Sequence, residues 1–250
     1  MSGKVHLVGA GPGDPELLTL KALRVLGAAD VVLVDDLVNR AILVHIHEDA
    51  RVIHVGKRGG CKSTPQAFIE RLMVAEAKAG RSVVRLKGGD PFIFGRGGEE
   101  AEALRNAGVE CEVVNGITSG LAAASAAGVP LTHRNAAQGV IFVTAHGTGE
   151  NEPDWAALAK TRMTLVVYMG VARCAAVQSA LLAAGLASST PALVVENASL
   201  ARERQVRTTI ARLREDVSAH EIESPAIMVI GEVARERCES LVRDHAAAAF

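Results

Sequence analysis

The sequence predicts an α/β protein of two domains, each with a sheet covered by helices. Two observations support this fold class. Between residues 4 and 114, short β-branched runs alternate with helical segments, which is the pattern of a mostly parallel sheet. After residue 114, a polar segment and an alanine-rich helix break the alternation, so we place the boundary there and expect domains 1–115 and 116–250.

The elements of the first domain follow from its apolar runs and turn residues. Asp14 is a good N-cap for the first helix, with Pro15 suited to the first helical position and Glu16 to the positive helix end. Gly80 and Gly108 are expected to end the next two helices. The predicted strands are residues 4–8, 31–34, 52–55, 83–86 and 110–114, and the predicted helices are residues 17–23, 63–79 and 99–106.

The second domain has a less regular pattern. Its strand at 205–209 is more polar than the others, so we expect it to be antiparallel or at a sheet edge. The predicted strands are residues 139–144, 164–169, 192–196, 205–209 and 226–231, and the predicted helices are residues 120–128, 154–159, 173–184, 210–214 and 233–244.

Composition excludes several classes of protein. Of the 250 residues 49% are hydrophobic, but they lie in short runs, and none approaches the ~20 residues needed to span a membrane. The N-terminus enters a strand without a signal sequence, which predicts a cytoplasmic protein. A net charge of −1 with 3% aromatic residues argues against a nucleic-acid partner.

No metal site is predicted. The four cysteines form no close pair, so buried free thiols are more plausible than a zinc site or disulfides. His133 and His146 have no acid or cysteine at metal-ligand spacing and are interpreted as surface or hydrogen-bonded side chains.

Residues 83–100 form the segment that local folding explains least. A buried strand ends in Gly88 and Gly89, whose backbone N–H groups no side chain would cover, and Asp90 precedes a proline that keeps it extended. Ligands bind at such strand ends in open α/β sheets. The alternative is a solvated turn, but a turn alone does not require several glycines, two phenylalanines and an arginine. We therefore predict a ligand-binding loop.

The glycine turn at residues 9–14 only partly resembles a dinucleotide-binding fingerprint. Asp14 stands where the third glycine belongs, and Pro12 lacks an amide that pyrophosphate would need. This weakens the case for a nicotinamide-dependent oxidoreductase.

Two further strand ends carry charged residues. Asp35 could read a ribose hydroxyl, act as a base or cap the next helix, and the residues alone leave these alternatives open. Lys57, Arg58 and Lys62 lie among glycines, either as a solvated turn or as contacts to an anionic ligand.

Nearly the whole chain resembles the uroporphyrinogen-III C-methyltransferase family, within the wider tetrapyrrole methyltransferase superfamily. The segment at 85–100 is the most specific to this branch. The resemblance rests on residues 8–19 (VGAGPGDPELLT), 55–58 (VGKR), 85–100 (RLKGGDPFIFGRGGEE), 116–119 (GITS), 168–170 (YMG) and 224–226 (SPA).

The resemblance implies two α/β domains with S-adenosylmethionine in the cleft between them, usually in a homodimer. It implies methylation of the tetrapyrrole at C2 and C7 to give precorrin-2, for sirohaem or cobalamin, with S-adenosylhomocysteine as by-product. The first domain would lie on the tetrapyrrole side and the second would complete the cofactor site.

The family's functional positions carry over residue by residue. Asp35 and Lys57 match the proposed proton acceptor and donor. Arg58, Arg96, His133 and Arg134 are cations in loops on the presumed ligand side, which makes them candidates for binding the substrate carboxylates. Val34, Asn115 and Ala198 depart from the family's Tyr, Pro and Gly; we expect Asn115 to change only loop stiffness. The implied cofactor contacts are Pro12, Gly88, Gly89, Asp90, Ile93, Thr118, Ser119, Met169, Ala198 and Ala226.

The residue types suit this chemistry. Methyl transfer from a sulfonium requires mainly positioning of donor and acceptor, without a metal, and one carboxylate and one ammonium could handle a ring proton. Two alternatives remain: a methyltransferase for another corrin-ring carbon, and a non-catalytic tetrapyrrole carrier. A carrier would keep the basic loops but would not need residues 88–90 beside Thr118 and Ser119.

Overall fold

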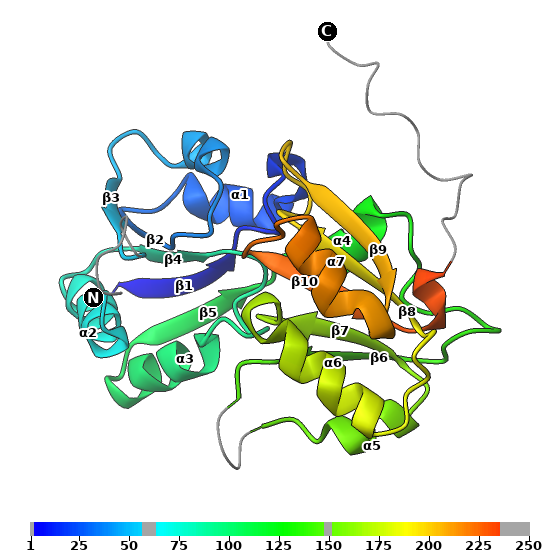
Figure 1. The fold of residues 1–250 in the computed structure, drawn as a ribbon. Helices are drawn as coiled ribbons and strands as arrows, with labels where there is room; N and C mark the ends of the chain where they lie inside the picture. Colours follow the sequence, from blue (N-terminus) through cyan, green and yellow to red (C-terminus); the bar gives the residue numbers. More distant parts are fainter. Residues whose placement is uncertain (1–2, 57–63, 148–151, 236–250) are drawn as a thin grey trace, which may run out of the picture. The chain divides into compact units, whose positions relative to one another are not determined.

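The computed structural model describes residues 3–56, 64–147 and 152–235, which contain two five-stranded sheets (Figure 1). The chain divides into two compact units, one ending at Ser119 and the other beginning at Gly120. The predicted boundary, between residues 115 and 116, lies in the loop just before this division.

The first sheet is entirely parallel, as the alternating pattern predicted. Its order is β3-β2-β4-β1-β5, so the strand ends that carry the predicted ligand loops lie along one edge. The strands are β1 (Lys4–Gly9), β2 (Val31–Val34), β3 (Arg51–His54), β4 (Val83–Lys87) and β5 (Glu110–Val114).

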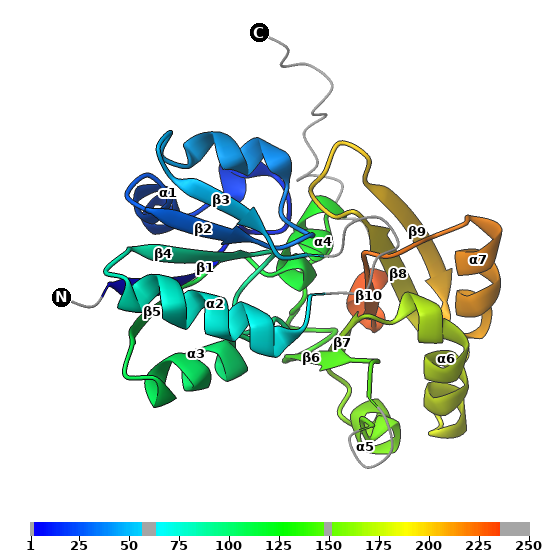
Figure 2. The same ribbon diagram turned by 90° about the vertical axis from the view of Figure 1, so that its left-hand side faces the viewer.

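Helices cover both faces of this sheet (Figure 2). On one face, α1 (Leu20–Leu26) and the 3-10 helix η2 (Arg40–His45) bury Leu26 and Ile42 against the sheet. On the other, α2 (Gln66–Lys78) and α3 (Gly97–Asn106) bury Met73 and Leu104. As predicted, Gly80 and Gly108 follow the ends of α2 and α3, and both have positive φ angles.

The predicted start of the first helix is wrong. Asp14 accepts a hydrogen bond from the Glu16 N–H at 2.9 Å, but it caps only a 3-10 turn, η1 (Pro15–Leu17). The chain is extended at Leu18, and the Thr19 hydroxyl caps α1 by accepting from Ala22 N–H at 3.1 Å. Two good caps compete within six residues, and the second one starts the α-helix.

The second sheet is mixed, with the order β6-β7-β10-β8-β9. Only the β6–β7 pairing is parallel. The polar strand β9 is antiparallel and at the edge, as its composition predicted. The strands are β6 (Val140–Thr144), β7 (Thr164–Tyr168), β8 (Pro191–Glu196), β9 (Arg204–Thr209) and β10 (Ala226–Ile230).

Three helices cover one face of the second sheet and share its core cluster: α5 (Trp155–Lys160), α6 (Cys174–Ala183) and α7 (Leu213–Ala219). A fourth helix, α4 (Ser119–Ala126), begins where the Gly120 N–H donates to the Tyr168 hydroxyl at 2.8 Å. Of the predicted helix at 233–244, the described part is a 3-10 turn, η6 (Glu232–Ala234), and the rest lies outside the described residues.

Two of the four cysteines are described, and both are free thiols: Cys174 is buried and Cys111 is half-buried. Cys61 and Cys238 lie outside the described residues. In the described part of the chain, no helix is long and apolar enough to cross a membrane. Nor do three metal-ligating side chains gather among the residues that the structure describes.

The carboxylate of Glu112 on β5 makes a testable contribution to stability. Lys21 of α1 and Lys4 of β1 both pair with it, and their hydrogen bonds lower its pKa to about 2. An unfolded chain would take up the proton near the ordinary value of 4.5. The stabilisation is therefore complete above that pH and disappears as the pH falls toward 2.

We predict that Glu112→Gln lowers the free energy of unfolding at pH 7, and that the deficit shrinks as the pH falls from 4.5 to 2. Urea unfolding at a series of pH values measures this difference. Glu102→Gln, which removes an exposed carboxylate 3.9 Å from Arg105, is the control and should change stability little. A deficit that stays constant with pH would contradict the prediction.

Candidate functional site

The candidate site of the first unit lies along the carboxyl edge of its sheet. Because β1, β2, β4 and β5 are parallel, the loops that follow them leave from the same edge. This edge gathers Asp35, the glycine turn after β1, residues 88–90 after β4 and Asn115 after β5. The sequence predicted the individual strand ends, and the strand order brings them together.

Three glycines allow the backbone after β1, β4 and β5 to meet. A Cβ atom on Gly116 would lie 2.2 Å from the Gly89 carbonyl oxygen and 2.8 Å from Gly9 Cα, which no side chain could tolerate. Gly11 and Gly89 also exchange backbone hydrogen bonds of 2.7 and 3.2 Å. The Gly89 N–H, which no side chain was expected to cover, is thus donated to the backbone carbonyl of Gly11 and is not free for a ligand.

Asp90 links the loops after β4 and β5. It is 7% exposed; one carboxylate oxygen accepts from Phe92 N–H at 2.8 Å, and the other from Asn115 Nδ2 at 3.2 Å and Gly116 N–H at 3.1 Å. The expectation that Asn115 changes only loop stiffness is therefore wrong, because its amide binds a buried carboxylate. Asp90 organises the loop with its side chain instead of presenting a free carboxylate.

Two hydrogen bonds hold the Asp35 carboxylate, and part of its side chain remains exposed to solvent. Its Oδ1 accepts from the Asp36 N–H at 3.1 Å and its Oδ2 from Arg85 Nη2 at 3.0 Å, while 35% of the side chain remains exposed. The 3-10 helix that follows is capped by Asn39, which accepts from Ala41 N–H at 3.1 Å. Of the three interpretations of Asp35, capping is excluded, and a role toward a ligand remains.

Buried charges lie directly behind Asp35. Arg85 and Lys87 on β4 and Glu100 on α3 are 2%, 3% and 0% exposed. Arg85 Nε donates to Glu100 Oε1 at 3.0 Å, and Lys87 Nζ lies 3.1 Å from Glu100 Oε2. Burial, together with the charge of Arg85, lowers the pKa of the Lys87 ammonium, whereas Glu100 and Asp35 oppose that shift.

The other predicted residues of the first unit are placed as follows. Thr118 is buried and, with Ser119, lies beside Gly89, since a Cβ on Gly89 would be 3.7 Å from Thr118 Cα. Pro12, Gly88 and Ile93 are half-buried in the two loops. Arg96 is exposed and donates to both Glu99 oxygens at 2.9 and 2.5 Å. Lys57 and Arg58 lie outside the described residues, as does Lys62.

In the second unit, the predicted cofactor residues gather at one sheet edge. Because β10 is antiparallel to β7 and β8, its first residue, Ala226, lies level with the ends of both. Met169 directly follows β7, is 46% exposed and has a φ of 53°, and Ala198 is buried in the turn after β8. His133 and Arg134 are exposed in another turn, where His133 Nδ1 accepts from Asn135 N–H at 3.2 Å.

Sequence reasoning assigned no role to Arg85, Lys87 or Glu100, although all three lie in the segment it singled out. A signal was present. Arg85 and Lys87 are two cations at alternate positions of a strand that is otherwise Val and Leu, so both point to the same buried face. Such cations require a buried partner from another element, and only the fold identifies it as Glu100.

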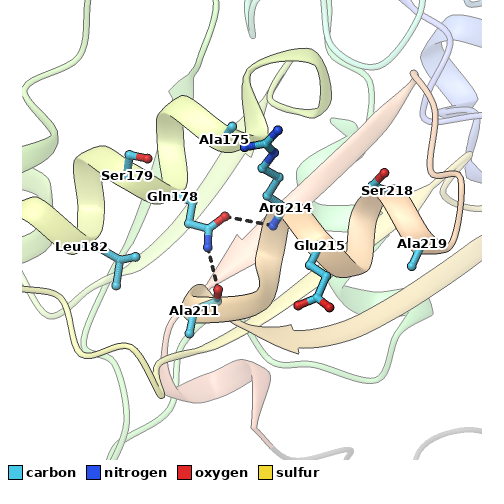
Figure 3. A pocket seen from close by; sticks show the side chains of 9 residues that line it. All are labelled: Ala175, Gln178, Ser179, Leu182, Ala211, Arg214, Glu215, Ser218 and Ala219. Atoms are coloured by element: carbon cyan, nitrogen blue, oxygen red, sulfur yellow. Dashed lines mark hydrogen bonds between the residues drawn. The ribbon is translucent and has the colours of Figure 1, made fainter.

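None of the predicted site residues lines a surface groove of the second unit. It runs between α6 and α7, where Gln178 crosses it by accepting from Arg214 N–H at 3.0 Å and donating to the Ala211 carbonyl at 2.7 Å (Figure 3). The Gln178 amide is thus used within the groove itself, and we assign the groove no function.

Comparison with known proteins identifies the family. The model of the family described as Tetrapyrrole (Corrin/Porphyrin) Methylases matches residues 4–214. This chain belongs to that family. It is 60% identical over 236 residues to a uroporphyrinogen-III C-methyltransferase of Pseudomonas aeruginosa, covering 94% of this chain and 96% of that protein.

Two solved structures of tetrapyrrole methylases are also similar to this chain. A uroporphyrin-III C-methyl transferase from Thermus thermophilus, complexed with S-adenyl homocysteine, matches with a TM-score of 0.81 and 45% identity over 93% of this chain and 99% of that one. A cobalt precorrin-4 methyltransferase matches with a TM-score of 0.82 but 32% identity, over 92% of this chain and 95% of that one. The two-sheet α/β fold predicted from the sequence is confirmed.

We predict that Asn115→Ala lowers the free energy of unfolding by about 1 kcal/mol, because the buried Asp90 carboxylate loses one of its donors. Asn115→Asp should cost more at pH 7, since it places a second carboxylate beside the first, and this extra cost should diminish in acid. Urea unfolding of both variants at pH 7 and pH 4.5 is the measurement. Wild-type stability of Asn115→Ala would show that the contact contributes nothing.

Proposed function

We propose that this chain is an S-adenosylmethionine-dependent methyltransferase that methylates uroporphyrinogen III at C2 and C7 to give precorrin-2, for sirohaem or cobalamin synthesis. The observation that carries the proposal is the 60% identity, over nearly the full length of both chains, to the uroporphyrinogen-III C-methyltransferase of P. aeruginosa. The proposed substrate and cofactor follow from that relative and from the Thermus enzyme.

The residues present suit the proposed cofactor. S-adenosylmethionine has no phosphate, so it does not need the free glycine amides that Pro12 and the Gly11–Gly89 pairing withhold. Small residues leave room for such a ligand and hydroxyls can hydrogen-bond to it, and Gly88, Thr118 and Ser119 supply both. The proposed contacts are Pro12, Gly88, Gly89, Asp90, Ile93, Thr118 and Ser119 of the first unit, and Met169, Ala198 and Ala226 of the second.

In the proposed mechanism, the bound cofactor supplies a methyl group from its sulfonium, and the chain orients the acceptor and handles its protons. Asp35 presents a carboxylate whose Oδ2 accepts a 3.0 Å hydrogen bond from the Arg85 guanidinium. That carboxylate accepts a proton from the tetrapyrrole, or holds a ring N–H, as a carbon of the ring becomes methylated. Lys57, outside the described residues, is the proposed proton donor.

Cations are proposed to bind the substrate's carboxylates. The proposed set is Arg58, Arg96, His133 and Arg134, of which Arg58 lies outside the described residues. Arg96 is already paired with Glu99, so binding a substrate carboxylate would require it to exchange or share that partner. Its contribution would therefore be smaller than that of an unpaired arginine.

A methyltransferase that acts at another corrin-ring carbon is the alternative, supported by the likeness to the cobalt precorrin-4 enzyme. Its 32% identity is well below the 60% of the uroporphyrinogen-III enzyme. Purified protein, S-adenosylmethionine and uroporphyrinogen III, incubated without oxygen and analysed by mass spectrometry and NMR, should give a product with two added methyl groups at C2 and C7. An unmethylated tetrapyrrole would overturn the proposal.

Asp35→Asn should lower turnover by about 10²- to 10⁴-fold, because the amide keeps the shape of the side chain but cannot accept a proton. Affinity for S-adenosylhomocysteine, measured by calorimetry, should not change. Single-turnover methylation at saturating cofactor is the measurement. Asp36→Asn removes the same charge from the exposed neighbouring side chain and should stay within about twofold of wild type. A near-normal rate for Asp35→Asn would rule out the acid–base role.

We also propose a homodimer in the cytoplasm. The dimer rests on the high apolar content and on the family resemblance. Light scattering at micromolar concentration should give about twice the chain mass of 26.1 kDa. A stable monomer with full activity would refute the dimer.

A further inference from the structure

The buried ion cluster behind Asp35 links that residue to a helix on the α2/α3 face of the first sheet. Leu33 of β2 and Arg85 of β4 are paired in register, and both belong to the strand faces turned toward α2 and α3. Asp35 lies two residues beyond Leu33 and therefore points to the same side. Its carboxylate meets the Arg85 guanidinium at the end of the sheet, where β2 stops.

The Arg85 guanidinium has two carboxylate partners. Its Nη2 donates to Asp35 Oδ2 and its Nε to Glu100 Oε1, both at 3.0 Å. Only 3% of the Arg85 side chain is exposed, so no water shell competes for the guanidinium. The planar fork cannot turn toward one partner without leaving the other. The orientation of Asp35 therefore depends on where Glu100 holds Arg85.

Glu100 is held by three donors from two other elements. Besides Arg85, Lys87 Nζ lies 3.2 Å from its Oε1, and Gln66 Nε2 of α2 donates to the same oxygen at 3.2 Å. The carboxylate is also the only negative charge of this cluster, among the described residues, that is fully buried. Without it, Arg85 and Lys87 would be two buried cations that share the half-exposed Asp35.

We propose that Glu100 is a positioning residue for the methylation site: through Arg85, it sets the orientation of the Asp35 carboxylate. This inference rests on the proposed function of Asp35. Glu100 touches no reacting atom in this arrangement. Its loss should lower the rate of the step that uses Asp35 and leave cofactor affinity unchanged.

The test compares Glu100→Gln, Asp35→Asn and the double variant in single-turnover methylation. Glu100→Gln keeps the size of the side chain but removes the charge that anchors Arg85, so kcat should fall about 10- to 100-fold. S-adenosylhomocysteine affinity should stay within about twofold. Because Glu100 acts through Asp35, the double variant should be no slower than Asp35→Asn alone. Losses that multiply, or a normal rate for Glu100→Gln, would overturn the proposal.

Glu76→Gln is the matched control. Glu76 is a buried carboxylate on α2 that also has two cationic partners, Arg51 and Arg81, but it has no contact with Asp35. This variant should lose stability and keep its turnover per folded molecule. If it loses as much turnover as Glu100→Gln, the effect is general destabilisation and the proposal fails.

Equilibrium unfolding of the same variants gives a second readout that needs no substrate. The stability loss of the Glu100→Gln, Asp35→Asn double variant should be smaller than the sum of the single losses, because both changes affect one network. Additive losses would overturn the link through Arg85. A wild-type protein inactive on uroporphyrinogen III would refute the proposed function, while the unfolding cycle would still decide whether Glu100 and Asp35 are coupled.

Gln66→Ala covers the case in which Glu100→Gln does not fold. It removes one neutral donor from Glu100 and leaves all four charges in place. We expect a smaller fall in kcat, about threefold, with cofactor affinity unchanged. An unchanged kcat in this variant would also count against the proposal.

Discussion

The close approach of three glycine backbones is the constraint on which the candidate site depends. Gly9 ends β1, and Gly89 and Gly116 follow its neighbours β4 and β5. A Cβ on either Gly9 or Gly116 would overlap backbone atoms of the others. Their contact brings the loops after β1, β4 and β5 within hydrogen-bonding distance. Gly11 can then pair with Gly89, and Asp90 can reach Asn115 and Gly116.

A buried cluster of charges is a second constraint on this edge of the sheet. Behind the strand ends, β4 carries two buried cations, and their charges are balanced by Glu100 from α3 and by Asp35, which directly follows β2. Removing one member of such a buried cluster typically costs about 3–5 kcal/mol, so the cluster ties the edge of the sheet to its helices. It leaves only one carboxylate, that of Asp35, partly open to solvent. A carboxylate that the protein fixes on one side and leaves accessible on the other needs little reorganisation when a ligand binds.

In the second unit, strand ends also gather at one sheet edge, but through antiparallel pairing instead of parallel pairing. Its strands β7 and β8 run antiparallel to β10, so two strand ends and one strand start meet at an edge. The chain turns there through residues with positive φ angles, including Met169, Asn197 and Ser199. Such conformations cost free energy in residues other than glycine, and they are found most often where a binding site needs them. Ala198, one of the proposed cofactor contacts, lies in this turn.

The sequence by itself determined the α/β class, all ten strands found among the described residues, the polar edge position of β9 and the segments that carry the candidate site. These features depend on local patterns of apolar, glycine and charged residues, which are visible in one stretch of chain. It did not place the start of α1, where Asp14 and Thr19 compete as caps. Nor did it show that the Gly89 N–H is used internally, that Asn115 binds Asp90, or that Arg85 holds Asp35. Only the tertiary structure decided the last three contacts, because each joins residues far apart in sequence, and the partner of a buried polar group depends on which strands lie side by side.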